Sequence, residues 1–281
     1  MSIPKHDHLN SDNYTDFNME MINKWIDEGI EWSKAISHEE YIKAMNGDWS
    51  ILEDSTPKEW FSPLLNPETG KFNGTKLLGL ASGGGQQMPV FVACGADCTI
   101  MDYSDRQLAS EKLVAEREGY KINMVKGDMT KRFPFDDNSF DMIYHAVSNN
   151  YIEDIYHLWR ECYRVLKPGG ILIAVMVNSV AYIFDDLYDL DEIDENYQLV
   201  AVNKLPYNPL KDPALYEKLM SWNDDYNLEF SHSLEEQIGG QLKAGFILTE
   251  IKEIRAFQGV LSQYFPEYLS TRSVKPNTNI I

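Results

Sequence analysis

Short apolar runs alternate with longer amphipathic segments through the middle of the chain. The run 171–177 contains no polar residue, so it needs cover on both faces, as a central strand of a parallel sheet has. Strands are expected at 76–81, 98–101, 122–125, 140–145 and 171–177, and helices at 86–94, 105–118 and 152–166. Because strand and helix repeat with short connections, the pattern predicts an α/β fold with a doubly wound, mostly parallel sheet.

The chain beyond residue 178 is less regular. A helix at 234–243 and strands at 246–254 and 269–274 would complete a seven-stranded sheet, and segments 197–205 and 227–231 could pair as short strands. Residues 179–231 are too many for an ordinary connection, and long insertions at this edge of a sheet often cover a ligand. We therefore expect an inserted substrate cap at 179–231, after the fifth strand.

The first 73 residues are aromatic-rich and helical in pattern. Apolar residues recur at helical spacing in 19–34, and Ser37 followed by Glu40 has the form of a capping box that starts a second helix. Residues 1–73 are predicted to form an N-terminal helical segment or lid, and residues 74–281 the main domain. Four tryptophans could either cover a bound ligand or pack as plain core: Trp25, Trp32, Trp49 and Trp60.

The composition indicates a globular protein with an acidic surface. The 281 residues are 43% hydrophobic, and 44 Asp and Glu against 25 Lys and Arg give a formal net charge of −19. This charge repels polyphosphate, which disfavours nucleic acid and anionic membranes as partners. No stretch approaches the roughly 20 apolar residues of a membrane span, and the first residues do not resemble a secretion signal.

Cysteine usage indicates a reducing compartment. Cys94, Cys98 and Cys162 make an odd count with no Cys-x-x-Cys pair, so no disulfide framework is expected and the predicted location is cytoplasmic. Cys94 and Cys98 are interpreted as small buried hydrophobes, and no metal site is predicted. The acidic run at 185–195 could be a solvated face or bind a cation, but it lacks the spaced pattern of a calcium loop.

A glycine loop is the most informative feature. The predicted strand at 76–81 leads into Gly83, Gly84 and Gly85, and a helix is expected to follow. Glycines let a ligand approach the backbone, and the start of a helix presents free N–H groups. The dinucleotide fingerprint fails because Met88 stands where its last glycine is required, and no Gly-Lys-Ser/Thr follows as in a P-loop.

Two acids follow the next two predicted strands. Asp102 ends the second strand and Asp128 follows the third, so both would lie beside the glycine loop at the carboxyl edge of the sheet. Asp102 could accept hydrogen bonds from ribose hydroxyls, and Asp128 could accept one from an adenine amino group. Each acid alone could equally be a helix cap or a turn former.

Taken in order, the glycine loop, Asp102, Asp128, the strand at 140–143 and the Leu-Lys-Pro-Gly-Gly segment at 166–170 resemble the class I S-adenosylmethionine-dependent methyltransferase superfamily. Within it, the chain is similar to the small-molecule group called methyltransferase type 11, including uncharacterised bacterial members. The resemblance covers about residues 76–178. It implies a Rossmann-like sheet, S-adenosylmethionine as the cofactor and a small-molecule methyl acceptor that the sequence does not identify.

The resemblance also implies residue roles. The glycine loop would line the methionine part of the cofactor, Asp102 would bind the ribose, and Asp128 the adenine amino group. Tyr103 and Met129 would pack against the adenine ring. The residues expected to bind the cofactor are Ala81, Ser82, Gly83, Gly85, Gln86, Asp102, Tyr103, Asp128, Met129 and His145.

The chain departs from the family pattern at the start of the loop. The family has an acid and then a glycine where this chain has Gly79 and Ala81. The absent acid removes one expected anchor for the ammonium group of the cofactor, which would be left to carbonyls, water or another side chain.

Methyl transfer from a sulfonium is an in-line displacement that needs few catalytic residues. His145, expected at the end of the fourth strand, is the candidate general base, and a structural histidine is the alternative. Ser148, Asn149 and Asn150 could orient an acceptor or cap the next helix, and capping is expected of at least one. His232 could reach the pocket or begin the late helix. The Asp/Asn-Pro-Pro-Tyr signature of nucleic-acid base methylation is absent.

Three functions therefore remain in view. The leading one is an S-adenosylmethionine-dependent methyltransferase acting on a small molecule. A nicotinamide-dependent oxidoreductase on a similar sheet and a non-catalytic S-adenosylmethionine-binding protein are the alternatives.

Overall fold

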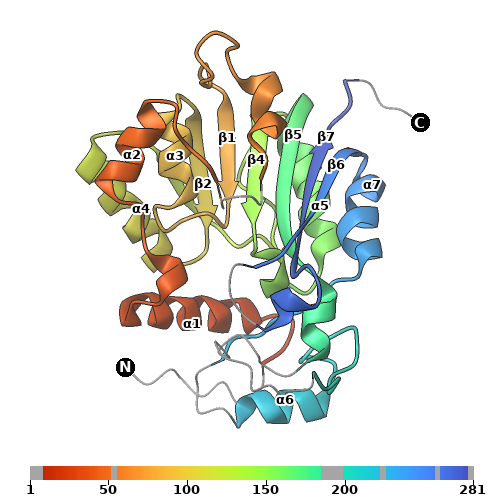
Figure 1. The fold of residues 1–281 in the computed structure, drawn as a ribbon. Coiled ribbons are helices and arrows are strands. Elements are labelled where there is room, and N and C mark those ends of the chain that lie inside the picture. The colour runs from red at the N-terminus through yellow and green to blue at the C-terminus, as the bar shows by residue number, and fades with distance from the viewer. Residues whose placement is uncertain (1–8, 52–55, 185–198, 222–225, 257–259, 278–281) are drawn as a thin grey trace.

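One mixed sheet forms the centre of the molecule. The computed structural model describes residues 9–51, 56–184, 199–221, 226–256 and 260–277. Within this part of the chain, seven strands pair in the order β3-β2-β1-β4-β5-β7-β6 (Figure 1). The strands are β1 (Lys76–Leu80), β2 (Asp97–Asp102), β3 (Asn123–Lys126), β4 (Phe140–Ala146), β5 (Leu166–Val177), β6 (Ile247–Ile254) and β7 (Tyr268–Val274).

The strand directions confirm the predicted fold class. Strands β1 to β5 pair in parallel, and β7 runs antiparallel to both of its neighbours, β5 and β6. The carboxyl ends of β1 to β5 therefore share one edge of the sheet. The strand order reverses between β1 and β4, which makes this edge the place where a Rossmann-like sheet binds its ligand.

Helices cover both faces of the sheet. Leu77 on β1 packs in a core with α3 and the N-terminal segment, whereas Leu78 packs in a second core with α5, because successive strand residues point to opposite faces. The α-helices are α1 (Tyr14–Glu28), α2 (His38–Met45), α3 (Gln87–Ala93), α4 (Asp105–Glu118), α5 (Ile155–Val165), α6 (Pro213–Met220) and α7 (Gly240–Ala244). The other helical turns are η1 (Glu31–Ser33), η3 (Lys58–Leu64), η4 (Asn149–Tyr151), η5 (Ser179–Ile183), η6 (Glu235–Gly239) and η7 (Leu261–Gln263).

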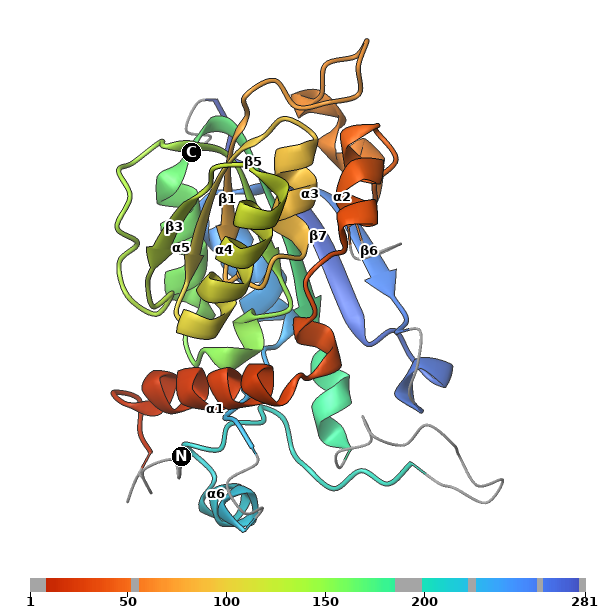
Figure 2. The ribbon, with the colours of Figure 1, turned by 90° about the vertical axis from the view of Figure 1, so that its left-hand side faces the viewer.

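Helix α1 lies across the carboxyl edge of the sheet, and α6 lies beyond it (Figures 1 and 2). The outer side of α1 buries Phe17 and Met21 against Leu219 of α6 and against Leu228 and Phe230 from the end of the insertion. The buried Asn18 amide donates to the Leu228 carbonyl at 2.8 Å and accepts from the Leu228 N–H at 2.7 Å. Helix α1 and the described parts of the insertion therefore pack as one layer over this edge.

Several predicted elements differ from the structure. The first helix ends at Glu28 instead of Lys34, because Gly29 adopts a left-handed conformation with φ 82° and caps it. The second helix does start with the predicted capping box at Ser37. The predicted pairing of 197–205 with 227–231 is wrong in the described part. There, the Phe230 N–H donates to the Asn150 carbonyl at 2.8 Å, so this backbone bonds to a loop.

The late helix is also irregular. It is not one α-helix over 234–243 but a π-helical turn, η6, followed by α7. The acidic run at 185–195 lies outside the described residues. Within the described part, no helix is long and apolar enough to span a membrane.

Candidate functional site

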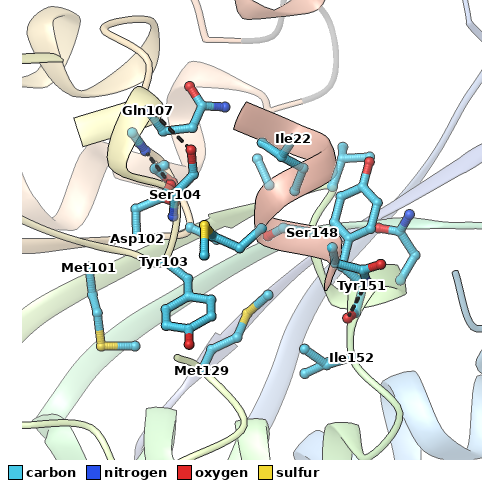
Figure 3. Close-up of a pocket in the computed structure, with 18 of the residues that line it drawn as sticks. Ile22, Met101, Asp102, Tyr103, Ser104, Gln107, Met129, Ser148, Tyr151 and Ile152 are labelled. Carbon is cyan, nitrogen blue, oxygen red and sulfur yellow. Dashed lines mark hydrogen bonds between the residues drawn. The ribbon is translucent and has the colours of Figure 1, made fainter. Parts of the chain in front are cut away.

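A cavity of about 630 Å³ opens between the carboxyl edge of the sheet and α1. Its floor comes from the loops after β1, β2, β3 and β4, and its roof from α1 and η1. Figure 3 shows Asp102, Tyr103 and Met129 on one side, Ser148 and Tyr151 on the other, with α1 beside them. This volume lies in the usual range for pockets that hold a small ligand, about 300–1,000 Å³.

Part of the glycine loop lines the cavity, and at Gly83 it leaves no room for a side chain. Ala81, Ser82 and Gly83 line the cavity. A Cβ on Gly83 would lie 2.7 Å from the Gln107 Cβ and 3.0 Å from a carboxylate oxygen of Asp102, so only glycine fits there. Ala81 adopts φ 49°, a conformation that glycine adopts without strain.

Gly85 lies behind the loop, outside the lining of the cavity. A Cβ there would clash with Val114 of α4 and approach the Ala35 Cβ to 3.2 Å. Its N–H donates to the buried Glu111 carboxylate, whose pKa burial raises to about 7. The structure thus places Gly85 in the packing between the loop and α4, outside the lining of the cavity.

The Met88 side chain accounts for the absence of an acidic residue at position 79. The fully buried Met88 side chain occupies the space beside Gly79, and a Cβ on Gly79 would clash with its sulfur and lie 3.0 Å from its Cε. Because a thioether fills this position, no acidic side chain fits at residue 79 without moving Met88. The carboxylates on the cavity surface come from elsewhere in the fold.

Asp102 is the buried carboxylate at the centre of the site. One oxygen accepts from the Gly83 N–H at 3.0 Å and the other from the Ser104 N–H at 2.9 Å. Burial raises its pKa to about 6, and the backbone hydrogen bonds offset part of this shift. Asp102 thus joins the ends of β1 and β2 and is ionised at neutral pH.

Helix α1 is bound to the residues expected to surround the adenine. The Tyr103 hydroxyl donates to the Asp16 carboxylate, and the Thr15 hydroxyl donates to an oxygen of Asp128 at 3.2 Å. Met129 follows Asp128 in the lining of the cavity. These bonds place the first turn of α1 directly over this part of the site.

His145 does not line the cavity, although Ala146 and Val147 do. It is fully buried, and its Nδ1 lies 3.2 Å from both the Leu80 carbonyl and the Ser148 hydroxyl. Burial lowers the pKa of its imidazole to about 4. The sequence placed His145 at the right strand end, but its side chain points into the protein and only Ser148 connects it to the cavity.

His232 is held within the protein instead of facing the cavity. His232 Nε2 lies 3.1 Å and 3.0 Å from the carbonyls of Asn149 and Ile152, and His232 does not line the cavity. The N-cap of α5 is Asp154, so the expectation that a residue of 148–150 caps this helix is wrong.

The aromatic and cysteine residues divide between lid and core. Of the four tryptophans, Trp25 and Trp32 line the cavity, while Trp49 and Trp60 are core residues. Cys94 and Cys98 are buried as expected.

The far end of the cavity is formed by residues that no sequence motif marks. Asn18 on α1, Tyr151 and Ile152 after β4, Glu229 in the insertion and Tyr268 at the start of β7 all line it. Asn18 and Glu229 belong to no motif, and they come together only because α1 packs on the insertion. No local pattern marks them.

The charges of the lining are all of one sign. Among the described residues that line the cavity, Asp102, Asp128 and Glu229 are acidic, and none is Lys, Arg or His. A ligand with a positive charge therefore fits the site better than a phosphate-bearing one. S-adenosylmethionine carries such a charge on its sulfonium, whereas a nicotinamide dinucleotide carries a pyrophosphate.

Comparison with known proteins gives relatives along most of the chain. A family model described as a methyltransferase domain matches residues 78–174. The chain is 41% identical over 256 residues to an uncharacterized methyltransferase, YbaJ, of Bacillus subtilis, covering 90% of this chain and 94% of the relative. It is 32% identical over 161 residues to a demethylmenaquinone methyltransferase of Corynebacterium efficiens, which covers 55% of this chain and 64% of that protein.

Solved structures share the fold. An S-adenosylmethionine-dependent methyltransferase from Mesorhizobium loti has a TM-score of 0.57 at 16% identity, over 78% of this chain and 98% of the other. A geranyl diphosphate C-methyltransferase from Streptomyces coelicolor, solved with S-adenosyl-L-homocysteine, has a TM-score of 0.51 at 15% identity, over 78% and 79%. None of these comparisons supports the hypothesis of a nicotinamide-dependent oxidoreductase. The chain belongs to the class I S-adenosylmethionine-dependent methyltransferases, and S-adenosylmethionine is its cofactor.

Proposed function

We propose that the protein transfers a methyl group from S-adenosylmethionine to a small-molecule acceptor by in-line displacement. The observation that carries this proposal is the cavity itself, which continues past the glycine loop and Asp102 to a second, mixed polar and apolar end at Tyr151 and Ile152. Holding two reactants in one enclosed site supplies much of the rate of such a reaction. A protein that only bound the cofactor would not need the second end.

The cofactor fits the residues of the first end. The backbone of Ala81, Ser82 and Gly83 would hold its methionine part, with Gln86 at the start of α3 beside it. Asp102 would accept from the ribose hydroxyls. When bound, S-adenosylmethionine supplies an electrophilic methyl group on a sulfonium, with a thioether as the leaving group.

The adenine would lie at the ends of β2 and β3. Asp128 would accept from its amino group, and Tyr103 and Met129 would flank the ring. Because Thr15 and Asp16 of α1 already bond to Asp128 and Tyr103, we assign α1 the role of a lid over this part of the site.

Names of relatives support a small acceptor. They include sterol 24-C-methyltransferases as well as the demethylmenaquinone methyltransferase. Residues 179–231 would serve as the cap over this acceptor, since Glu229 lies in the lining and Leu228 packs on α1. The buried free thiols of the three cysteines fit a cytoplasmic location.

We assign His145 a positioning role. Its uncharged imidazole would orient the Ser148 hydroxyl, which lines the cavity, and would not itself contact the acceptor. Direct general-base catalysis by His145 would require a side chain within hydrogen-bond reach of the acceptor.

Two measurements test the proposed function. Isothermal titration with S-adenosylmethionine and S-adenosylhomocysteine should show binding of both. Incubation with radiolabelled methyl donor and a metabolite extract should give labelled small molecules. Binding without any transfer would identify a non-catalytic binding protein instead.

A further inference from the structure

The second end of the cavity is assembled from segments that are far apart in sequence. Ser148, Tyr151 and Ile152 lie opposite Asp102 and Tyr103 (Figure 3). The end of β5, the start of β7 and the insertion complete this end, through Val177, Tyr268 and Glu229. Among the described residues that line this second end, Glu229 is the one with a formal charge.

The backbone around Glu229 is held on both sides. The Asn18 amide forms two hydrogen bonds with the backbone of Leu228, at 2.7 Å and 2.8 Å. On the other side, the Phe230 N–H donates to the Asn150 carbonyl at 2.8 Å. Both flanking side chains are buried, Leu228 at 0% and Phe230 at 1% exposure. The backbone of Glu229 is thus fixed at the junction of α1, the β4 loop and the insertion.

The Glu229 carboxylate lies among hydroxyl groups. The Tyr182 hydroxyl donates to its Oε2 at 2.6 Å. Burial raises the pKa of Tyr151, and the nearby Glu229 carboxylate raises it further. Glu229 also raises the pKa of Tyr268. An anionic ligand at this end would therefore meet a negative charge, and the described lining residues offer it no cation.

We propose that Glu229 binds the methyl acceptor, and that the acceptor presents a hydrogen-bond donor group, an amine or a hydroxyl, on a partly apolar body. The apolar body follows from Ile22, Ile152 and Val177, which line the same cavity. The negative charge of Glu229 excludes acceptors whose reacting end is a carboxylate or a phosphate. The inference rests on the proposed function, because it names the substrate class of that site.

The test uses the full chain with tritiated S-adenosylmethionine and a low-molecular-mass extract of bacterial cells. The unreacted donor, which is itself a cation, is first removed by reversed-phase chromatography, and labelled products are then separated near neutral pH on cation and anion exchangers. Mild alkali applied to the unbound fraction cleaves methyl esters and leaves methyl ethers intact. Glu229→Gln removes the charge and keeps an oxygen for Tyr182, and Glu116→Gln, an exposed acid on α4, is the matched control. S-adenosylhomocysteine affinity, measured by titration, is a second readout for each variant.

We expect the label on the cation exchanger for an amine, or in the unbound fraction in alkali-stable form for a hydroxyl, because methylation of a carboxylate would give an uncharged ester that alkali cleaves. Glu229→Gln should lower the initial rate at limiting extract by about tenfold or more, since a charged hydrogen bond is lost, while S-adenosylhomocysteine affinity stays within about twofold. Glu116→Gln should change neither. Label retained on the anion exchanger, label released by mild alkali, or an unchanged rate in Glu229→Gln would overturn the inference and leave methyl transfer standing. No label in any fraction would overturn the proposed function with it.

Discussion

Replacing Asp102 by Asn tests the centre of the cofactor site. Both carboxylate oxygens of Asp102 accept from backbone N–H groups, and burial raises its pKa from 3.8 to about 6. The amide introduced by Asp102→Asn would lack the charge and would have one oxygen in place of two. Hydrogen bonds to charged groups contribute about 1.5–3 kcal/mol, so this substitution should weaken S-adenosylhomocysteine binding by about tenfold to a hundredfold at neutral pH.

The raised pKa adds a pH dependence with a definite sign. Ribose hydroxyls donate to the ionised carboxylate, so affinity is fully present above about pH 6 and is lost as pH falls through that value. The folded free protein behaves in the opposite way. Because the folded pKa exceeds the unfolded one, Asp102 costs stability above about pH 6, and this cost of about 3 kcal/mol is relieved as pH falls towards 4.

Isothermal titration of S-adenosylhomocysteine between about pH 5 and 8 measures the first effect, and urea unfolding over the same range measures the second. The wild type should lose up to about tenfold in affinity per pH unit below pH 6, and Asp102→Asn should show no such slope. If the variant bound as tightly as the wild type, or kept the same slope, Asp102 would not be in the cofactor site.

Three further predictions concern the groups around the site. Burial raises the pKa of Glu111 from 4.5 to about 7, so its charge costs stability above that pH. Glu111→Gln should therefore raise the free energy of unfolding near pH 8 by about 1–3 kcal/mol and flatten its pH dependence between about 5 and 7. An unchanged urea-unfolding profile would contradict this. Gly79→Ala should lower the free energy of unfolding by about 1–3 kcal/mol through the clash with Met88. The double variant with Met88→Ala should lose less than the sum of the two single changes. Additive effects would show that the two positions do not compete for space. Tyr103→Phe removes the hydroxyl that donates to Asp16. It should increase amide hydrogen exchange in α1 and the rate of S-adenosylhomocysteine release several-fold, with little change in melting temperature. Unchanged exchange and release would show that this hydrogen bond does not hold the lid in place.

The sheet, and the edge at which the predicted site residues gather, could be predicted from the sequence. Apolar runs and helical spacing are local signals, so α4 and six of the strands lie within one residue of their predicted bounds, whereas β5 begins five residues earlier, at Leu166. Ala81, Ser82, Gly83, Asp102 and Asp128 could be placed because each lies at the end of a strand or within three residues of it, and parallel strands bring such residues to one edge.

The directions of side chains and the acceptor end depend on tertiary packing. His145 lies at the predicted strand end, but the alternation of the strand turns its imidazole into the protein, and Gly85 faces α4 instead of the cavity. The absent acid at Gly79 became explicable once Met88 was seen beside it. Glu229 joins the site through Asn18, a residue more than 200 positions away, because burial of apolar side chains packs the insertion on α1. Contacts of that range carry no local pattern, so the fold had to be known before this end of the site could be described.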